Sequence, residues 1–411
     1  MNLKKVYVGM TGDLIHPGII NIIKHAREYG QVIVGLVSDE GVAKYKRLPA
    51  MPFNARKNVI EHIKGVVEVV KQDTIDYIPN LKKIKPDYVV HGDIWRTTQP
   101  IIRKQVIETI KKWGGEVIEI PYSKGYSSNS FHHYLKKIGT TKEVRQERLK
   151  RLLESKQTIR FLGAHDGLSA TIVENANMRI NFSVEEFDGI WLSSRTSAVN
   201  KGISVNIDNN KSEMNDLIYQ VLENTTKPII VDCDQITNIT EAEYISRTFE
   251  RFGVSAIVLS ENNNNKISEI ISKSKKAQVT DDFMLFIKIE NYKDVQDMIQ
   301  RVQSYINSGA DGIMIQINSS NKSNISEFCK QYQELKIHVP LITSSTTKAQ
   351  MDETEHKKFA SNIIVYEDQL LKSVIGPMEE STKSILINQN CNESDKKSTS
   401  MSEIISSIHK S

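Results

Sequence analysis

The segment Val8–Gly18, which reads V-G-M-T-G-D-L-I-H-P-G, has residue types that suit a phosphate group. It ends an apolar, strand-like run and opens a helical pattern, with His16 directly before the predicted helix. A helix N-terminus offers backbone N–H groups and a partial positive charge, and both favour an anion. The segment therefore predicts a phosphate-binding turn with His16 as a candidate ligand.

Four short blocks of basic and small polar residues follow this turn. They are K-Y-K-R-L-P at Lys44–Pro49, N-A-R-K at Asn54–Lys57, H-G-D-I-W at His91–Trp95 and S-K-G-Y-S-S at Ser123–Ser128. A plainer interpretation exists for some of them, because Arg56 could be a solvated charge and Asp93 could cap a helix.

A second candidate site lies in the C-terminal half, where P-I-I-V-D-C-D at Pro228–Asp234 puts Asp232 and Asp234 at the end of an apolar run. Two carboxylates there can hold Mg²⁺ directly or through water, because this ion prefers oxygen ligands. The alternative is that both residues are merely polar groups at an exposed rim.

The first 135 or so residues must position the first set, and they alternate β-rich runs with helical patterns. This alternation is typical of a parallel sheet with covering helices, in which ligands bind beyond the carboxyl ends of the strands. The predicted strands are Lys5–Gly9, Gln31–Val37, Val66–Val70, Tyr88–His91 and Glu116–Ile120, with helices at Gly18–Tyr29, Asn54–Ile63 and Gln99–Trp113. We therefore expect a doubly wound α/β domain over residues 1–136.

The second set belongs to a longer series of apolar runs separated by segments that can form crossover helices. The runs are Ile159–Gly163, Asp188–Ser193, Pro228–Asp232, Ala256–Leu259, Phe283–Ile289, Gly312–Ile317, Pro340–Thr343 and Ile363–Tyr366. Eight such strands predict a (β/α)₈ barrel over residues 158–382, with its chemistry at the strand ends. We expect a helical linker over residues 137–157 and a disordered polar tail over residues 383–411.

The composition excludes several classes of protein. No stretch approaches the roughly 18 to 20 apolar residues of a membrane span, and the N-terminus shows no secretory signal. The three cysteines have no metal-type spacing and favour a reducing compartment, so we expect a cytoplasmic protein. A net charge of +4 with interleaved signs shows no nucleic-acid footprint.

In their linear order, the motifs of the first half resemble the cytidylyltransferase family. The resemblance implies transfer of a nucleotide from CTP with Mg²⁺ as the expected ion, on a Rossmann-like nucleotidyltransferase domain. It also implies that His16, Lys46 and Arg56 contact phosphates as the catalytic group. The implied nucleotide-binding residues are Gly9, Met10, Thr11, Asp13, Gly18, Gly92, Asp93, Ser127 and Ser128.

This sequence departs from the family pattern at four positions of these motifs. Two of them follow Lys124, where Tyr126 replaces the isoleucine of Gly-Ile-Ser-Ser-Thr and Asn129 replaces its threonine. Ile19 stands at the second histidine of His-x-Gly-His, and Ile94 replaces an acidic residue of Gly-Asp-Asp-Trp. Isoleucine cannot donate a hydrogen bond to the transition state, and losing one such donor typically costs about 10²- to 10³-fold in rate.

The runs G-A-H-D-G-L-S-A-T-I-V-E at Gly163–Glu174 and F-D-G-I-W-L-S-S at Phe187–Ser194 resemble phosphoenolpyruvate mutase and its isocitrate lyase relatives. The resemblance implies a mutase-like barrel that holds Mg²⁺ through Asp232 and Asp234. It places the substrate near Ser193, Ser194, Glu261 and Lys288. Lys288 stands where the family has an arginine, and the lid segment is rich in asparagine.

The pairing of the two resemblances implies phosphonate metabolism, and three hypotheses follow. The first is a cytidylyltransferase for 2-hydroxyethyl- or 2-aminoethylphosphonate, fused to a mutase-like barrel that acts on phosphoenolpyruvate or serves as a scaffold. The second is a cytidylyltransferase for glycerol or choline phosphate. The third is a catalytically degenerate nucleotide-binding or scaffold protein. All three predict small-molecule partners, no nucleic acid, no membrane and a homo-oligomer formed through the barrel.

Overall fold

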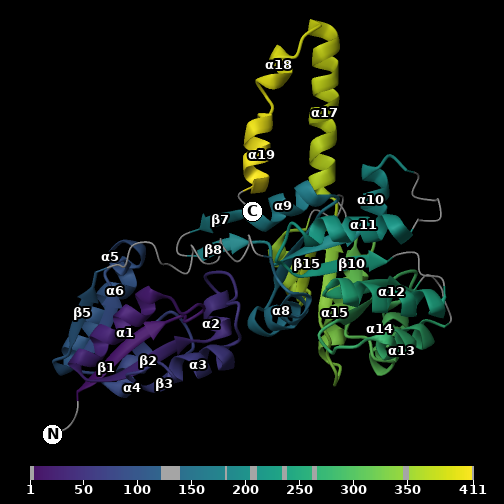
Figure 1. Cartoon of the computed structure of the whole chain (residues 1–411). Coiled ribbons are helices and arrows are strands. Elements are labelled where there is room, and N and C mark those ends of the chain that lie inside the picture. Colours follow the sequence, from purple (N-terminus) through teal and green to yellow (C-terminus); the bar gives the residue numbers. More distant parts are fainter. Residues whose placement is uncertain are drawn as a thin grey trace. The chain divides into compact units, whose positions relative to one another are not determined.

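The computed structural model describes residues 4–121, 139–180, 183–203, 211–233, 238–261, 266–345 and 351–409. The chain divides into two compact units, one around an N-terminal sheet and one around a closed barrel (Figure 1). The first unit also includes Glu154–Lys156 and Asn177–Glu185. Within the described ranges, none of the helices has the length and apolar character needed to cross a membrane.

The N-terminal sheet has five parallel strands in the order β3-β2-β1-β4-β5, which confirms the predicted doubly wound domain. Its strands are β1 Lys5–Met10, β2 Gln31–Val37, β3 Val66–Gln72, β4 Tyr88–Gly92 and β5 Glu116–Ile120. Its helices are α1 Pro17–Tyr29, α2 Asp39–Ala43, α3 Phe53–Glu61, α4 Ile78–Ile84, α5 Trp95–Thr98 and α6 Pro100–Ile110, with a short 3₁₀ helix at Lys111–Trp113.

Both faces of this sheet are buried, because successive side chains of a strand point to opposite faces. Val6 and Val8 of β1 join one apolar cluster with side chains of α1 and α3, whereas Tyr7 joins a second cluster with α4 and α6. The strand order changes direction between β1 and β4. In sheets of this kind, ligands bind at the carboxyl ends of the strands on either side of such a switch.

The second unit contains eight parallel strands that close into a barrel, as predicted. They are β6 Ile159–Gly163, β9 Gly189–Ser193, β10 Ile229–Cys233, β11 Ala256–Ser260, β12 Met284–Ile289, β13 Gly312–Ile317, β14 Leu341–Ser345 and β15 Ile363–Tyr366. The surrounding helices are α9 Gly167–Asn175, α10 Ser194–Asn200, α11 Lys211–Leu222, α12 Ile239–Phe252, α13 Ile267–Ala277, α14 Val295–Asn307, α15 Lys322–Gln333, α16 Glu353–Lys358 and α17 Gln369–Asn388.

The predicted linker contains the helix α8, Lys142–Ser155, most of which belongs to the barrel unit. Buried Arg145 donates from Nη2 to the carbonyl of Thr225 at 2.7 Å, and Gln146 donates from Nε2 to the carbonyl of Val254 at 3.0 Å. Both carbonyls precede barrel strands, so α8 covers the amino-terminal end of the barrel.

The structure differs from the sequence-based expectation in two further elements. The two-stranded sheet of β7 Asn177–Ile180 and β8 Ser183–Glu186 was not predicted. Met178, Ile180 and Val184 alternate with polar residues, so the sequence did carry a strand signal, although these apolar side chains are exposed. The tail predicted to be disordered includes the end of α17, α18 Asn392–Asp395 and α19 Met401–His409. A helix satisfies its backbone internally and needs no burial to do so, and Ser400 and Glu403 form a capping box at α19.

Candidate functional site

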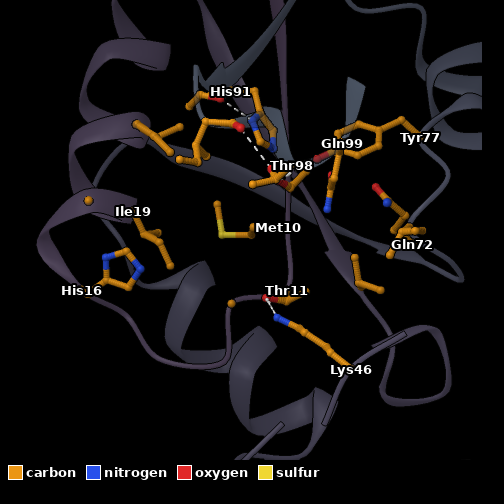
Figure 2. Close-up of a pocket in the computed structure, with 18 of the residues that line it drawn as sticks. Met10, Thr11, His16, Ile19, Lys46, Gln72, Tyr77, His91, Thr98 and Gln99 are labelled. Atoms are coloured by element: carbon orange, nitrogen blue, oxygen red, sulfur yellow. Dashed lines mark hydrogen bonds between the residues drawn. The ribbon is translucent and has the colours of Figure 1, made fainter. Parts of the chain in front are cut away.

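The sheet cavity, of about 370 Å³, lies at the carboxyl ends of β1 and β4 (Figure 2). Seven of the residues predicted to contact nucleotide line it, namely Gly9, Met10, Thr11, His16, Gly18, Lys46 and Gly92. Their roles remain predictions. No aspartate or glutamate is found among the described lining residues, so the cavity suits an anion.

His16 is the N-cap residue of α1, with an extended backbone and Pro17 as the first helical residue. The His16 side chain makes no capping hydrogen bond to this helix, and His16 and Gly18 at its N-terminus line the cavity. Burial lowers the pKa of His16 below its usual value, which keeps the ring neutral at pH 7. A neutral imidazole can donate one hydrogen bond to a phosphate oxygen.

Lys46 supplies the cation of this cavity. Its Nζ donates to Oγ1 of Thr11 at 3.2 Å, which joins the loop after α2 to the loop after β1. Burial lowers the pKa of Lys46, and the nearby charge of Asp13 acts in the opposite direction. A charged amine at this position is well suited to neutralise a phosphate group.

Three of the predicted residues lie outside the cavity lining, and their predicted roles are untested. Arg56 is fully buried and outside the cavity lining, where it donates to the carbonyls of Thr11, Val37 and Met51 and to the carboxylate of Asp39. Asp13 accepts from the backbone N–H of Ala50 at 2.7 Å.

The third is Asp93, which also lies outside the cavity lining. Its backbone N–H donates to Ile120 at the end of β5, at 2.9 Å. The predicted Ser127 and Ser128 lie outside the described residues.

Ile19 and Ile94 both line the sheet cavity. Ile19 is therefore at the wall where the family motif would present a second histidine. Further lining residues that were not predicted are Tyr45, Gln72, Tyr77, His91, Thr98 and Gln99. Of these, Tyr45 and His91 lie inside motifs quoted from the sequence, K-Y-K-R-L-P and H-G-D-I-W.

The barrel cavity, of about 580 Å³, lies at the carboxyl ends of the barrel strands. Ser193 and Lys288, from the predicted substrate site, and Asp232, a predicted metal ligand, line it, and their roles remain predictions. Nζ of Lys288 lies 3.2 Å from Oε1 of Glu290. Ser194 begins α10 outside the lining, and Asp234 lies outside the described residues.

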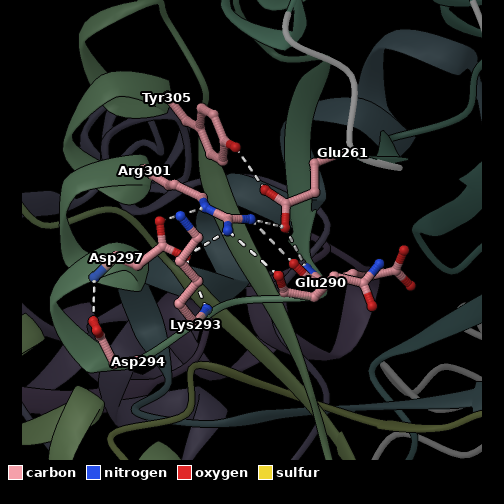
Figure 3. A network of polar contacts seen from close by, with 8 residues as sticks. Glu261, Glu290, Lys293, Asp294, Asp297, Arg301 and Tyr305 are labelled. Carbon is pink, nitrogen blue, oxygen red and sulfur yellow. Dashed lines mark hydrogen bonds and ion pairs between the residues drawn. The ribbon is translucent and has the colours of Figure 1, made fainter.

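Glu261 belongs to a buried polar network rather than to the cavity lining (Figure 3). It accepts from Nη1 of Arg301 at 2.8 Å, from the hydroxyl of Tyr305 at 2.6 Å and from the backbone N–H of Glu290 at 2.6 Å. Burial raises the pKa of Glu261, and these donors act in the opposite direction. Sequence identifies the acid but not the direction in which its side chain turns.

The residues at the barrel cavity can be compared with the ligands that the predicted Mg²⁺ would need. The carboxylate of Asp232 lines the barrel cavity, and an oxygen ligand of this kind fits Mg²⁺. The described ranges contain no group of three or more acidic, histidine or cysteine side chains placed for a metal. Mg²⁺ commonly takes only one or two protein carboxylates and completes its shell with water and substrate, so Asp232 remains a suitable ligand.

The fold and the cavities define a two-domain enzyme architecture, a Rossmann-like nucleotidyltransferase-type domain followed by a (β/α)₈ barrel. Residues 149–386, more than half of the 411, match the family model described as phosphoenolpyruvate phosphomutase. The chain therefore belongs to the phosphoenolpyruvate phosphomutase family. Residues 7–134 match the model described as cytidylyltransferase-like, so the chain joins two enzyme domains.

Individual proteins resemble one half or the other. The FAD synthase of Ferroglobus placidus is 37% identical over 90 residues, which are 22% of this chain and 59% of that protein's length. The phosphoenolpyruvate phosphomutase of Tetrahymena pyriformis is 22% identical over 258 residues, which cover 58% of this chain and 82% of that protein.

Among solved structures, a phosphonopyruvate hydrolase in complex with oxalate and Mg²⁺ has a TM-score of 0.58 and 23% identity. The match covers 65% of this chain and 95% of that one. At this level of identity the likeness establishes the barrel fold.

Proposed function

We propose that the first domain transfers CMP from CTP to a small phosphonate such as 2-hydroxyethyl- or 2-aminoethylphosphonate. The observation that supports this proposal is an anion-suited cavity in a cytidylyltransferase-like domain, on a chain whose other domain belongs to the phosphoenolpyruvate phosphomutase family. A cytoplasmic location and a homo-oligomer formed through the barrel are parts of the same proposal.

In this reaction, a phosphonate oxygen bonds to the α-phosphorus of CTP, and the bond from that phosphorus to the bridging oxygen breaks. Pyrophosphate leaves with the bonding electrons. The protein's task is to position the reactants and to stabilise charge that develops on the phosphate oxygens. Mg²⁺ bound to the triphosphate would offset part of its negative charge.

Two side chains of the sheet cavity fit these tasks. Lys46 offers a positive charge, and its bond to Thr11 keeps that charge beside the turn after β1. His16 offers an N–H donor at the start of α1, where the helix dipole also favours an anion. Arg56 contributes indirectly, because it holds the turn that carries Thr11.

For the barrel, we propose that Asp232 holds Mg²⁺ and that Lys288 and Ser193 bind phosphoenolpyruvate. This assignment can be tested by incubating the protein with phosphoenolpyruvate and an added decarboxylase that removes any phosphonopyruvate formed. Unchanged phosphoenolpyruvate would leave the barrel as a scaffold.

One observation favours a second function, nucleotide binding without turnover. Ile19 lines the sheet cavity and cannot donate a hydrogen bond, so a bound nucleotide would lack one contact in the transition state. This candidate predicts that calorimetry detects CTP while no pyrophosphate is released.

The deciding experiment measures pyrophosphate release from CTP, ATP or GTP with Mg²⁺ and a panel of phosphonates and alcohol phosphates. We expect release with CTP and a phosphonate, and a loss of about 10²-fold or more in Lys46→Met, because a charge contact to the transition state disappears. Lys44→Met is the matched control, since Lys44 is exposed and outside the cavity lining. Pyrophosphate release only with glycerol or choline phosphate would show that the acceptor is an alcohol phosphate. No release with any acceptor would contradict the proposed enzymatic activity.

A further inference from the structure

His91 is the second-last residue of β4 and lies on the wall of the sheet cavity, and no role has been proposed for it so far (Figure 2). Its Nδ1 lies 2.8 Å from the carbonyl oxygen of Gly92. A carbonyl oxygen only accepts, so Nδ1 must carry the hydrogen. In the neutral ring, the lone pair therefore resides on Nε2.

The surroundings of His91 keep the ring neutral at pH 7. Burial lowers its pKa, which outweighs the opposite effects of the Gly92 carbonyl and of the Glu119 carboxylate. The other neighbours are aromatic: the Trp95 ring of α5 is stacked at 4.1 Å, and the Tyr77 ring is 6.2 Å away between centroids. Glu119 is itself paired, as described next.

A chain of contacts also fixes the plane of the His91 ring. The indole of Trp95 stacks at 12° to it and donates from Nε1 to Oε1 of Glu119 at 2.6 Å. Arg96 of α5 and Arg103 of α6 hold the same carboxylate at 2.6 Å and 2.8 Å. The two arginines offset the charge of Glu119 and leave His91 immobile but uncharged.

We propose that His91 is a catalytic residue whose Nε2 takes the last proton from the attacking phosphonate. This inference rests on the proposed nucleotidyl transfer and adds a general base to it. A proton acceptor must be neutral before the reaction, and the buried, stacked ring of His91 with its hydrogen on Nδ1 meets this condition. Phosphoryl groups retain one proton in part near neutral pH.

The step is balanced as follows. The O–H bond of the phosphonate monoanion breaks, its proton moves to Nε2, and the freed oxygen bonds to the α-phosphorus of CTP. The bond from that phosphorus to the bridging oxygen breaks, and pyrophosphate leaves. The imidazolium then returns its proton to solvent.

The pH dependence of kcat/KM tests this role, with CTP, Mg²⁺ and the phosphonate that gives the fastest pyrophosphate release. His91→Gln should lose about 10²-fold or more below neutral pH, where the acceptor still carries a proton. The deficit should shrink at alkaline pH, where the acceptor is already doubly ionised. His25→Gln, at a half-exposed position on α1, should match the wild type throughout.

A second acceptor sharpens the test. A difluoromethylene phosphonate ionises fully at lower pH, so His91→Gln should process it nearly as well as the wild type. A deficit that is the same at every pH and for both acceptors would show a structural role and overturn the inference while transfer itself stands. Absence of pyrophosphate release in the wild type would overturn both.

Discussion

His16 and Ile19 lie one helical turn apart at the wall of the sheet cavity, and only the histidine can donate a hydrogen bond. Restoring the missing donor should therefore accelerate nucleotidyl transfer. We expect Ile19→His to raise kcat by up to about 10²-fold, measured as pyrophosphate release from CTP.

The matched control is Ile20→His, on the same helix but 42% exposed and outside the cavity lining. It should leave kcat unchanged. Equal gains in both variants, or none in Ile19→His, would show that the cavity lacks the geometry for a second donor.

At the level of single residues, the sequence predicted the members of the sheet cavity better than it predicted side-chain directions. Residues of the turn after β1 line the cavity because their backbone is confined by a strand and a helix. Arg56 and Glu261 instead turn inward to partners that are far away in sequence. Their types suggested a ligand contact, and only the three-dimensional packing shows where their hydrogen bonds go.

The contact between β5 and the helices α5 and α6 depends on one carboxylate. Glu119 is only 10% exposed, and hydrogen bonds from Arg103, Arg96 and Trp95 lower its pKa from 4.5 to about 2. Because the folded pKa lies below the unfolded one, the stabilisation is complete above about pH 4.5 and is lost as the pH falls towards 2. It amounts to at most roughly 3 kcal/mol.

Urea titrations across this range should show that loss in the wild type. In Glu119→Gln the free energy of unfolding should be lower at neutral pH, and this part of the pH dependence should be missing. Glu108→Gln, on the exposed side of α6, should behave like the wild type. An unchanged acid slope in Glu119→Gln would contradict the assignment.

At the level of elements, the thirteen strands of the sheet and the barrel follow from apolar runs of the right length between helical patterns. The two strands β7 and β8 do carry a periodic signal, because Met178, Ile180 and Val184 alternate with polar residues, and the sequence-based prediction missed it. The packing of α8 was not predicted either. Arginines in a charge-rich helix are typical of a solvated surface, and only the structure shows that Arg145 is buried and donates to a carbonyl oxygen.

In the described residues, buried apolar side chains form a cluster in the barrel unit and one cluster on each face of the N-terminal sheet. Each of the two units therefore has apolar packing of its own. Each is expected to unfold cooperatively by itself, so calorimetry should resolve two transitions. CTP with Mg²⁺ at 100 times its Kd should stabilise one of them by about 2.7 kcal/mol and leave the other in place. Cytidine, which lacks phosphates, should move neither; a single transition shifted by CTP would contradict two independent cores.

Arg56 determines what kind of natural variation the first domain can tolerate. Its planar guanidinium meets three carbonyl oxygens and one carboxylate at once, and a lysine would preserve the charge without reproducing that fork. We therefore expect descendants of this domain to retain arginine here even after their substrate has changed. In an alignment of such domains, an arginine at position 56 would indicate a shared scaffold. It would not indicate which nucleotide each domain uses.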